Sequence, residues 1–200
     1  MRKFSFKEYY NIQSSFMESY VKELWKALKN LTKLLHDNDI SFTIIGGAAR
    51  NQYGFLKTTE DVDIVVAKAD KEKMLHLPIG YIREVSHGRG KVFFLHNPKI
   101  KIEVIYEDEI SGDGKNGLKY ENPKMISNYI HDTPFLPLEK LIEYKLSSGI
   151  YGNRMKDFTD IIELIRANKL DNKYAEDFRE DLKNKYIELW NMARIQIDNF

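Results

Sequence analysis

The sequence of 200 residues carries 31 Lys and Arg against 30 Asp and Glu, a formal net charge of +1 at pH 7. This length suits one domain, or a compact catalytic core with a helical extension, and we expect no second large domain. The balanced charge excludes a global electrostatic field that recruits nucleic acid or anionic membranes. The lack of cysteine excludes disulfide and thiolate chemistry, and this lack fits a reducing compartment.

Residues 1–16 interrupt their aromatic side chains with polar ones and lack the continuous apolar segment and cleavage site of a signal peptide. No apolar run approaches the roughly 20 residues of a membrane-spanning helix. We therefore expect a soluble cytoplasmic protein. Residues 16–36 then place apolar side chains at spacings of three and four, which predicts an amphipathic helix that packs on the rest of the protein.

A short β-branched run follows at residues 40–45 and ends in the pair Gly46 and Gly47. Residues 48–54 suffice for two helical turns. The sequence DVDIVV at 61–66 predicts a second strand, whose flanking valines and isoleucine favour a central position in a sheet.

Further strands are predicted at residues 81–86, 91–96 and 101–106, the first two joined by a hairpin turn at 87–90. Residues 107–123 are rich in turn formers and predict a mobile surface loop.

Beyond that loop the apolar period is helical. One helix is predicted to begin after Pro137 and to end at Gly149, and a second is predicted at 153–168, capped by Asn153. A last, highly charged helix is predicted from about Asp171 to Ile197.

The predicted fold class is therefore α+β, a mixed β-sheet core of four or five strands flanked by helices, with a C-terminal helical bundle. We expect residues 1–135 to form the core with its N-terminal helix, and residues 136–200 to form the helical domain.

Asp61 and Asp63 are the chemically unusual feature of the strand at 61–66. Side chains alternate faces along a strand, so these two carboxylates point the same way while Val62 and Ile64 point into the core. Their repulsion raises at least one pKa unless cations neutralise them, and Mg²⁺ is the usual partner of paired carboxylates. The alternative is an edge strand with one face in water, where acidic residues are harmless.

Glu103 is a third candidate, because its side chain lies opposite the apolar face of the strand at 101–106. If this strand lies beside the Asp strand, Glu103 completes a triad that binds metal and serves as a base in phosphoryl or nucleotidyl transfer. A solvated strand face with Lys101 beside Glu103 is the alternative.

Several basic residues are predicted either to line a phosphate or RNA cleft or to be ordinary surface charges: Arg50, Lys57, Arg83, Arg89 and Lys91. Asp157 and Asp160 lie on one helix face, and a short turn brings that helix back against the one that carries Lys145. The alternative for Lys145 and Asp160 is an ordinary interhelical ion pair.

The pattern IIGGAARNQYGFLKTTEDVDIVV resembles the nucleotidyltransferase superfamily of polymerase-β-like folds, in which a strand, a Gly-Gly or Gly-Ser pair, a short helix and an acidic strand follow one another. KTTEDVDIVV is similar to the AbiEii-like toxin and minimal nucleotidyltransferase branch, and LPLEKLIEYKLSSGIYGNRMKDFTDIIELI resembles its later helices. The resemblance spans about residues 40–166.

The resemblance implies a role for each matching position. Asp61, Asp63 and Glu103 would bind Mg²⁺, with Mn²⁺ as the alternative ion. The nucleotide would be bound by the remaining matched residues: Gly46 and Gly47 would hold its phosphates, Lys145 would contact the triphosphate, and Asp157 or Asp160 would orient Lys145 or the nucleotide. Gly47 departs from the pattern, since serine often stands there and its hydroxyl is lost.

We therefore expect a Mg²⁺-dependent nucleotidyltransferase that transfers a nucleoside monophosphate from an NTP to a hydroxyl acceptor. The resemblance implies a tRNA end or a protein side chain as acceptor, and the toxin of a toxin–antitoxin pair as the biological role. An aminoglycoside acceptor is a variant within the same class. No membrane and no stable duplex DNA binding are expected. The alternative is a catalytically silent protein of this fold that binds a protein or RNA.

Overall fold

The computed structural model describes residues 6–59, 61–77, 81–84, 91–96, 99–112 and 116–195. Of these, it describes only the backbone of 6–21, 81–84, 91–96 and 99. Within these residues one mixed sheet has the order β3-β4-β5-β2-β1-β7-β6. Its strands are β1 (Phe42–Ile45), β2 (Asp61–Val66), β3 (Tyr81–Glu84), β4 (Lys91–His96), β5 (Lys99–Tyr106), β6 (Asn128–Ile130) and β7 (Thr133–Phe135). The β2–β5 and β1–β7 pairs are parallel, and the other pairs are antiparallel.

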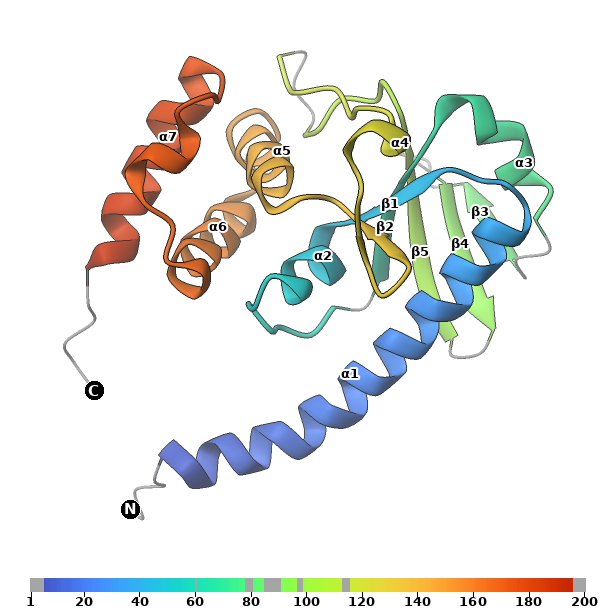
Figure 1. Cartoon of the computed structure of the whole chain (residues 1–200), viewed down its shortest axis with the longest axis horizontal. Coiled ribbons are helices and arrows are strands. Elements are labelled where there is room, and N and C mark those ends of the chain that lie inside the picture. Colours follow the sequence, from blue (N-terminus) through green and yellow to red (C-terminus); the bar gives the residue numbers. More distant parts are fainter. Residues whose placement is uncertain are drawn as a thin grey trace.

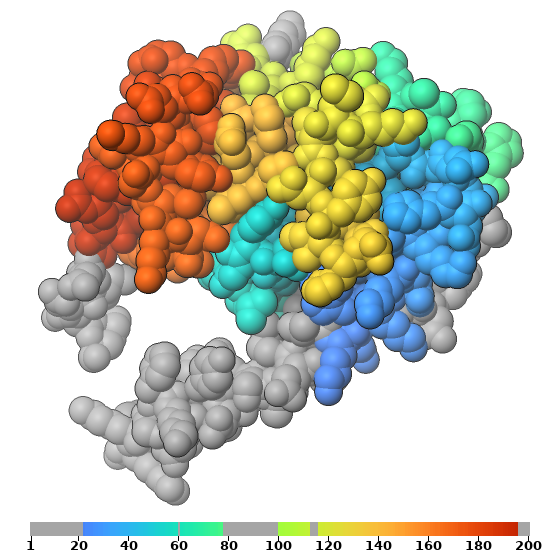
Figure 2. Space-filling model, viewed as in Figure 1, coloured from blue at the N-terminus to red at the C-terminus, as the bar shows by residue number. Residues whose placement is uncertain are grey.

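The helices flank this sheet, so the predicted α+β class is confirmed. They are α1 (Phe6–Asp37), α2 (Gly46–Gln52), α3 (Lys71–Leu75), α4 (Pro123–Ile126), α5 (Leu138–Tyr151), α6 (Met155–Asn168) and α7 (Glu180–Arg194). Figure 1 shows the sheet between the C-terminal half of α1 and the three helices α5, α6 and α7. In Figure 2 the surface of α2 (cyan) adjoins that of α5 and α6 (orange). No helix among the described residues is long and apolar enough to cross a membrane.

The two faces of the sheet differ in chemistry. Val62 and Ile64 are fully buried, as predicted from their alternation with the acidic residues. On the same face, Phe135 of β7 lies beside Ile44 and packs edge-on against Trp25 of α1, with ring centroids 6.0 Å apart. Since α1 covers this apolar face, the carboxylates are presented on the opposite face, toward α5.

The described residues of the predicted mobile loop at 107–123 pair with one another and pack on α5. The described residues on either side of 113–115 pair as a hairpin, in which Ile110 bridges Lys119. The Oγ of Ser147 in α5 accepts a hydrogen bond from the Leu118 amide and lies 2.7 Å from Ser111 Oγ. These buried contacts fix the hairpin on α5, which a composition-based prediction could not include.

The boundaries of the C-terminal helices also differ from the prediction. α5 continues past Gly149 to Tyr151. A Cβ at Gly149 would overlap the Phe158 ring, so this glycine permits close packing of α5 on α6 instead of ending the helix. Asn153 adopts a left-handed conformation (φ 52°) instead of capping α6.

The last predicted helix is divided. A 3₁₀ turn at Asn172–Ala175 precedes α7, and the Asp171 side chain caps that turn by accepting hydrogen bonds from two backbone amides.

Strands β6 and β7 were missed because they are only three residues long and Pro134 interrupts the β7 pattern. The predicted hairpin turn at 87–90 lies outside the described residues. β7 ends at Phe135 and α5 begins at Leu138, while the division into two domains at residue 135 stays a prediction.

Candidate active site

The three acidic candidates meet on one face of adjacent strands. In the parallel pairing of β2 with β5, Asp63 lies opposite Glu103 and Asp61 lies opposite Lys101. One carboxylate oxygen from each of Asp61, Asp63 and Glu103 lies within 4.8 Å of the others, which is close enough to share one ion. The prediction that the strand of Glu103 lies beside the Asp strand is confirmed, and the edge-strand alternative is wrong, because β2 lies between β1 and β5.

Lys101 contacts two members of this carboxylate cluster. Its Nζ donates a hydrogen bond to Glu103 Oε1 and lies 3.7 Å from Asp61 Oδ2. The hydrogen bond to Glu103 raises the pKa of the Lys101 ammonium group. The sequence therefore supplies a cation at the same period-two spacing that brings Asp61 and Asp63 together.

Asp63 is the least compensated of the three acidic residues. Burial raises the pKa of its carboxyl group to about 7, and the negative charges of Asp61 and Glu103 add to this effect. The positive charges of Lys145 and Arg154 act in the opposite direction. The predicted rise of one pKa in the acidic pair thus falls on Asp63.

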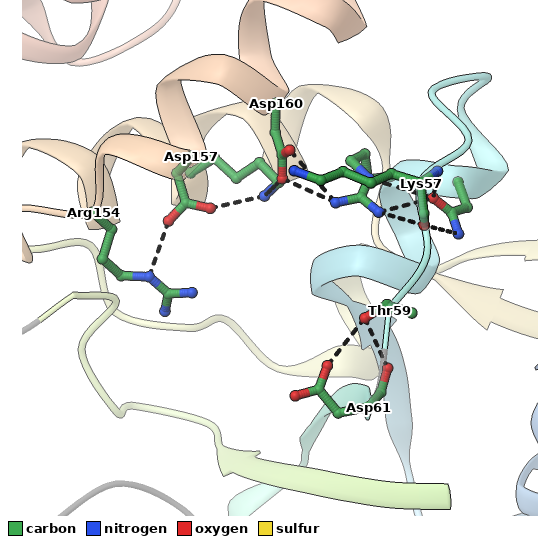
Figure 3. A network of polar contacts seen from close by, with 9 residues as sticks. Lys57, Thr59, Asp61, Arg154, Asp157 and Asp160 are labelled. Atoms are coloured by element: carbon green, nitrogen blue, oxygen red, sulfur yellow. Dashed lines mark hydrogen bonds and ion pairs between the residues drawn. The ribbon is translucent and has the colours of Figure 1, made fainter.

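The glycine pair makes room for this cluster. Gly46 has a positive φ of 62°, and a Cβ at that position would overlap the Asp63 carboxylate. A Cβ at Gly47 would lie 2.7 Å from the Oγ1 of Thr59. Thr59 in turn donates to Asp61 Oδ1 at 3.0 Å, so its side chain fills the space beside α2 and orients the first acidic residue (Figure 3).

A buried ion network forms the opposite wall of the site. Lys145 Nζ donates to Asp157 Oδ1 and to Asp160 Oδ2, both at 2.8 Å, and Arg50 Nη1 lies 3.3 Å from Asp160 Oδ2. Although burial alone would raise the pKa of Asp160, Lys145 and Arg50 hold it below its usual range. Lys145 is only 9% exposed, so both carboxylates are primarily its partners within the fold.

Arg154 extends this network to the solvent. Its Nε lies 3.2 Å from Asp157 Oδ2, while its side chain is 44% exposed. Figure 3 shows Arg154 reaching from the start of α6 toward the side of the cleft where Asp61 lies. Arg154 precedes Asp157 by three residues, a spacing that favours an ion pair at the start of a helix, and this signal was not used in the sequence analysis.

All ten predicted site residues line one cleft of about 510 Å³: Gly46, Gly47, Arg50, Lys57, Asp61, Asp63, Glu103, Lys145, Asp157 and Asp160. The cleft is also lined by residues that the prediction missed: Thr59, Tyr120, Tyr144, Arg154 and Lys156. The side chains of Arg83, Arg89 and Lys91 lie outside the described residues.

The cleft is electrostatically divided. The carboxylate cluster lies on the sheet, whereas the charged side chains that are exposed at the rim are basic, namely Lys57, Arg154 and Lys156. Oxygen ligands in a cluster suit a hard divalent cation, and basic side chains suit phosphate oxygens. The arrangement is therefore suited to a metal-bound polyphosphate.

Comparison with solved structures identifies the fold. The chain is similar to an antigenic nucleotidyltransferase-like protein from Paracoccidioides brasiliensis, with 16% identity, a TM-score of 0.54, and coverage of 86% of this chain and 88% of that one. ANT(2″)-Ia in complex with adenylyl-2″-tobramycin gives 12% identity, a TM-score of 0.47, and coverage of 84% and 98%. The first likeness shows a nucleotidyltransferase-like fold. No family model and no curated protein sequence matches the chain.

Proposed function

We propose that this protein is a metal-dependent nucleotidyltransferase, which transfers a nucleoside monophosphate from an NTP to a hydroxyl group and releases pyrophosphate. The observation that carries the proposal is the carboxylate cluster of Asp61, Asp63 and Glu103, opposite a basic rim in one cleft. A fold with no such chemistry has no physical need to bring three carboxylates together on one face of its sheet.

The carboxylate cluster fits a divalent metal ion of the hard class. Three carboxylates supply oxygen ligands that together offset the charge of one such ion, and Mg²⁺ favours sites that combine a few carboxylates with substrate phosphates. Asp61, Asp63 and Glu103 would hold the ion. When bound, the ion would polarise the phosphate and stabilise the negative charge that develops during transfer. We favour Mg²⁺, with Mn²⁺ as the alternative.

The proposed reaction is an in-line displacement at the α-phosphorus. The acceptor oxygen forms a bond to the α-phosphorus, and the bond to the oxygen that bridges to the β-phosphorus breaks, so that pyrophosphate leaves with the electron pair. The acceptor proton passes to a carboxylate of the cluster. Glu103 is the candidate base, because its side chain is 40% exposed and hence accessible to an acceptor.

Arg154 is our candidate for the contact with the triphosphate, together with the backbone of Gly46 and Gly47. The resemblance implied Lys145 for this role, but Lys145 already pairs with two buried carboxylates. Arg154 has only Asp157 as an ionic partner among the described residues and projects into the cleft. We infer that Lys145, Asp157 and Asp160 orient Arg154 and fix α5 on α6.

The acceptor that we favour is anionic, such as a tRNA end. The exposed charged residues of the rim are Lys57, Arg154 and Lys156, which attract a phosphate backbone and repel a polycation such as an aminoglycoside. A protein hydroxyl is the second acceptor class implied by the resemblance. The toxin role and the AbiEii-like branch belong to the proposal as the biological setting in which such a transfer would act.

The test is incubation of the purified protein with each α-³²P-labelled NTP and Mg²⁺, in the presence of total RNA, lysate protein or an aminoglycoside. Asp61→Asn/Asp63→Asn serves as the inactive control. Label that enters the RNA pool, and that is missing with the variant, is the expected result.

Other outcomes would redirect the proposal. Label in protein or in the aminoglycoside would change the acceptor but keep the reaction class. If no pool is labelled while Mg²⁺-dependent NTP binding persists, the catalytically silent alternative would hold. An absence of NTP binding would contradict the enzyme proposal.

A further inference from the structure

Lys101 is the one cation that contacts the carboxylate cluster directly within the described residues, and the proposed reaction gives it no role. Its ammonium donates to Glu103 Oε1 and lies 3.7 Å from Asp61 Oδ2, so it reaches two of the three carboxylates. The side chain is 35% exposed, which leaves it a path toward the solvent. The register of β5 with β2 places it there, because Lys101 pairs with Asp61 across the ladder.

An ammonium group at this position competes with a divalent ion. The oxygens that Lys101 contacts belong to carboxylates that would ligate the ion. One oxygen from each of Asp61, Asp63 and Glu103 lies within 4.8 Å of the others. Two cations that share these oxygens would repel each other across a few ångströms. Either Lys101 or the metal can therefore bind the shared oxygens of Asp61 and Glu103.

We propose that Lys101 is a resident counter-cation, which holds Asp61 and Glu103 together when no metal is bound and which moves out when a divalent ion enters. This inference rests on the proposed metal site. It makes Lys101 a positioning residue that weakens the binding of free metal, so that the ion enters mainly as its complex with the nucleotide. The four-carbon stem of Lys101 allows this displacement without movement of β5.

The experiment compares binding of Mn²⁺ alone, followed by electron paramagnetic resonance of the free ion, in the wild-type protein and in Lys101→Met. The substitution removes the charge and retains most of the aliphatic stem. We expect the Kd for Mn²⁺ to fall about tenfold in Lys101→Met, because one competing charge is lost. In EDTA the same variant should melt at a lower temperature than the wild type, and saturating Mn²⁺ should reverse this difference.

Two control variants separate charge from fold. Lys101→Arg keeps the charge and should bind Mn²⁺ as the wild type does. Lys156→Met removes an exposed lysine that lines the cleft beside the carboxylate cluster and makes no ion pair with it, and it should leave the Kd for Mn²⁺ within about twofold of the wild type. If Lys101→Met does not fold, Lys101→Gln provides the neutral variant.

The failure of this inference differs from the failure of the proposed function. If the wild type binds Mn²⁺ and the Kd of Lys101→Met is equal or higher, the counter-cation role would be overturned while the metal site stands. A similar gain in Lys156→Met would also overturn it, since the effect would then be a general one of the cleft. Absence of Mn²⁺ binding in both proteins would overturn the metal site and the inference together.

Discussion

Asp63 and Glu103 lie directly opposite each other across the parallel pair β2 and β5, on the face of the sheet that α1 leaves uncovered. Two carboxylates in this position repel each other, and Lys101 pairs with Glu103 and Asp61 but makes no ion pair with Asp63. The cluster therefore has one member that lacks a direct ion pair among the described residues, and a further cation can bind there.

The first prediction concerns pH and stability. Burial raises the pKa of Asp63 to about 7. Between the ordinary carboxyl pKa of about 4 and this value, the folded protein retains a proton that the unfolded chain has lost, so the free energy of unfolding falls as pH rises. Asp63→Asn should flatten this decline. Urea unfolding in EDTA at several pH values from 4 to 8 measures it.

The matched control for this prediction is Asp177→Asn, which changes an exposed carboxylate. Its pH profile should follow that of the wild type. Adding Mg²⁺ at pH 8 should stabilise the wild type and the control but not Asp63→Asn. A decline with pH that persists in Asp63→Asn would assign the titration to another group.

A second prediction concerns the buried network. Lys145→Met leaves Asp157 and Asp160 without their shared partner, and the removal of one member of a buried ion pair costs about 3–5 kcal/mol. Urea unfolding at pH 7 measures the loss. Lys156→Met, on the exposed start of α6, should change the free energy of unfolding by less than about 0.5 kcal/mol. Equal losses of unfolding free energy in the two variants would contradict the inference that Lys145 stabilises the fold.

A third prediction uses two glycines with a left-handed backbone conformation, Gly46 at the start of α2 and Gly54 just after its end. Gly46→Ala and Gly54→Ala both force alanine into a positive φ, but only at Gly46 does the added Cβ overlap a carboxylate, that of Asp63. Gly54→Ala would bring its Cβ no closer than 3.7 Å to Ala167. Both variants should lose about 1 kcal/mol or more of stability. Only Gly46→Ala should also lose the increase in melting temperature that Mg²⁺ produces, and retention of that increase would show that Asp63 tolerates displacement.

The acidic cluster could be predicted from sequence because one rule, the alternation of side chains along a strand, decides the face of every residue in β2 and β5. To predict the pairing of these strands, it was enough to assume that two apolar strands lie side by side in one sheet. The place of Lys101 follows from the same alternation, since it lies two residues before Glu103 on β5, and it was named in the sequence analysis only as a neighbour on a solvated strand face. Thr59 precedes β2, and its hydrogen bond to Asp61 was missed because a threonine before a strand has no distinctive pattern of its own.

The remaining differences arise from contacts between segments distant in sequence. Gly149 is a residue type typical of a helix end, but in α5 it makes room for Phe158 of α6. Residues 107–123 have the composition of a loop, but Ser111 and Leu118 bind Ser147. Rules based on local sequence do not include such contacts. The end of α5 and the structure of the described residues on either side of 113–115 therefore could not be predicted from composition.

A fourth prediction separates phosphate binding from metal binding. Arg154→Met should weaken the binding of a Mg²⁺–NTP complex about tenfold, because a hydrogen-bonded contact between charged groups is lost. Its effect on Mn²⁺ binding without nucleotide should be small, since Arg154 makes no ion pair with the carboxylate cluster. Calorimetric titration measures both. A loss of Mn²⁺ affinity equal to the loss of nucleotide affinity would indicate that Arg154 acts through the electrostatics of Asp63 instead of through the phosphates.

The last prediction tests how Gly47 and Thr59 share the space beside α2. In the wild type a Cβ at position 47 would lie 2.7 Å from Thr59 Oγ1, so Gly47→Ser alone must displace the side chain that donates to Asp61. Thr59→Ala alone removes that donor. In the double variant the serine enters the space that the threonine has left, and the two losses of unfolding free energy should therefore sum to more than the loss in the double variant. A double-mutant cycle by urea unfolding measures this coupling, which should reach about 1 kcal/mol for groups in contact. Strict additivity would contradict direct competition for one space. Recovery of Mg²⁺-dependent stabilisation in the double variant would indicate that a hydroxyl from position 47 or from position 59 can orient Asp61.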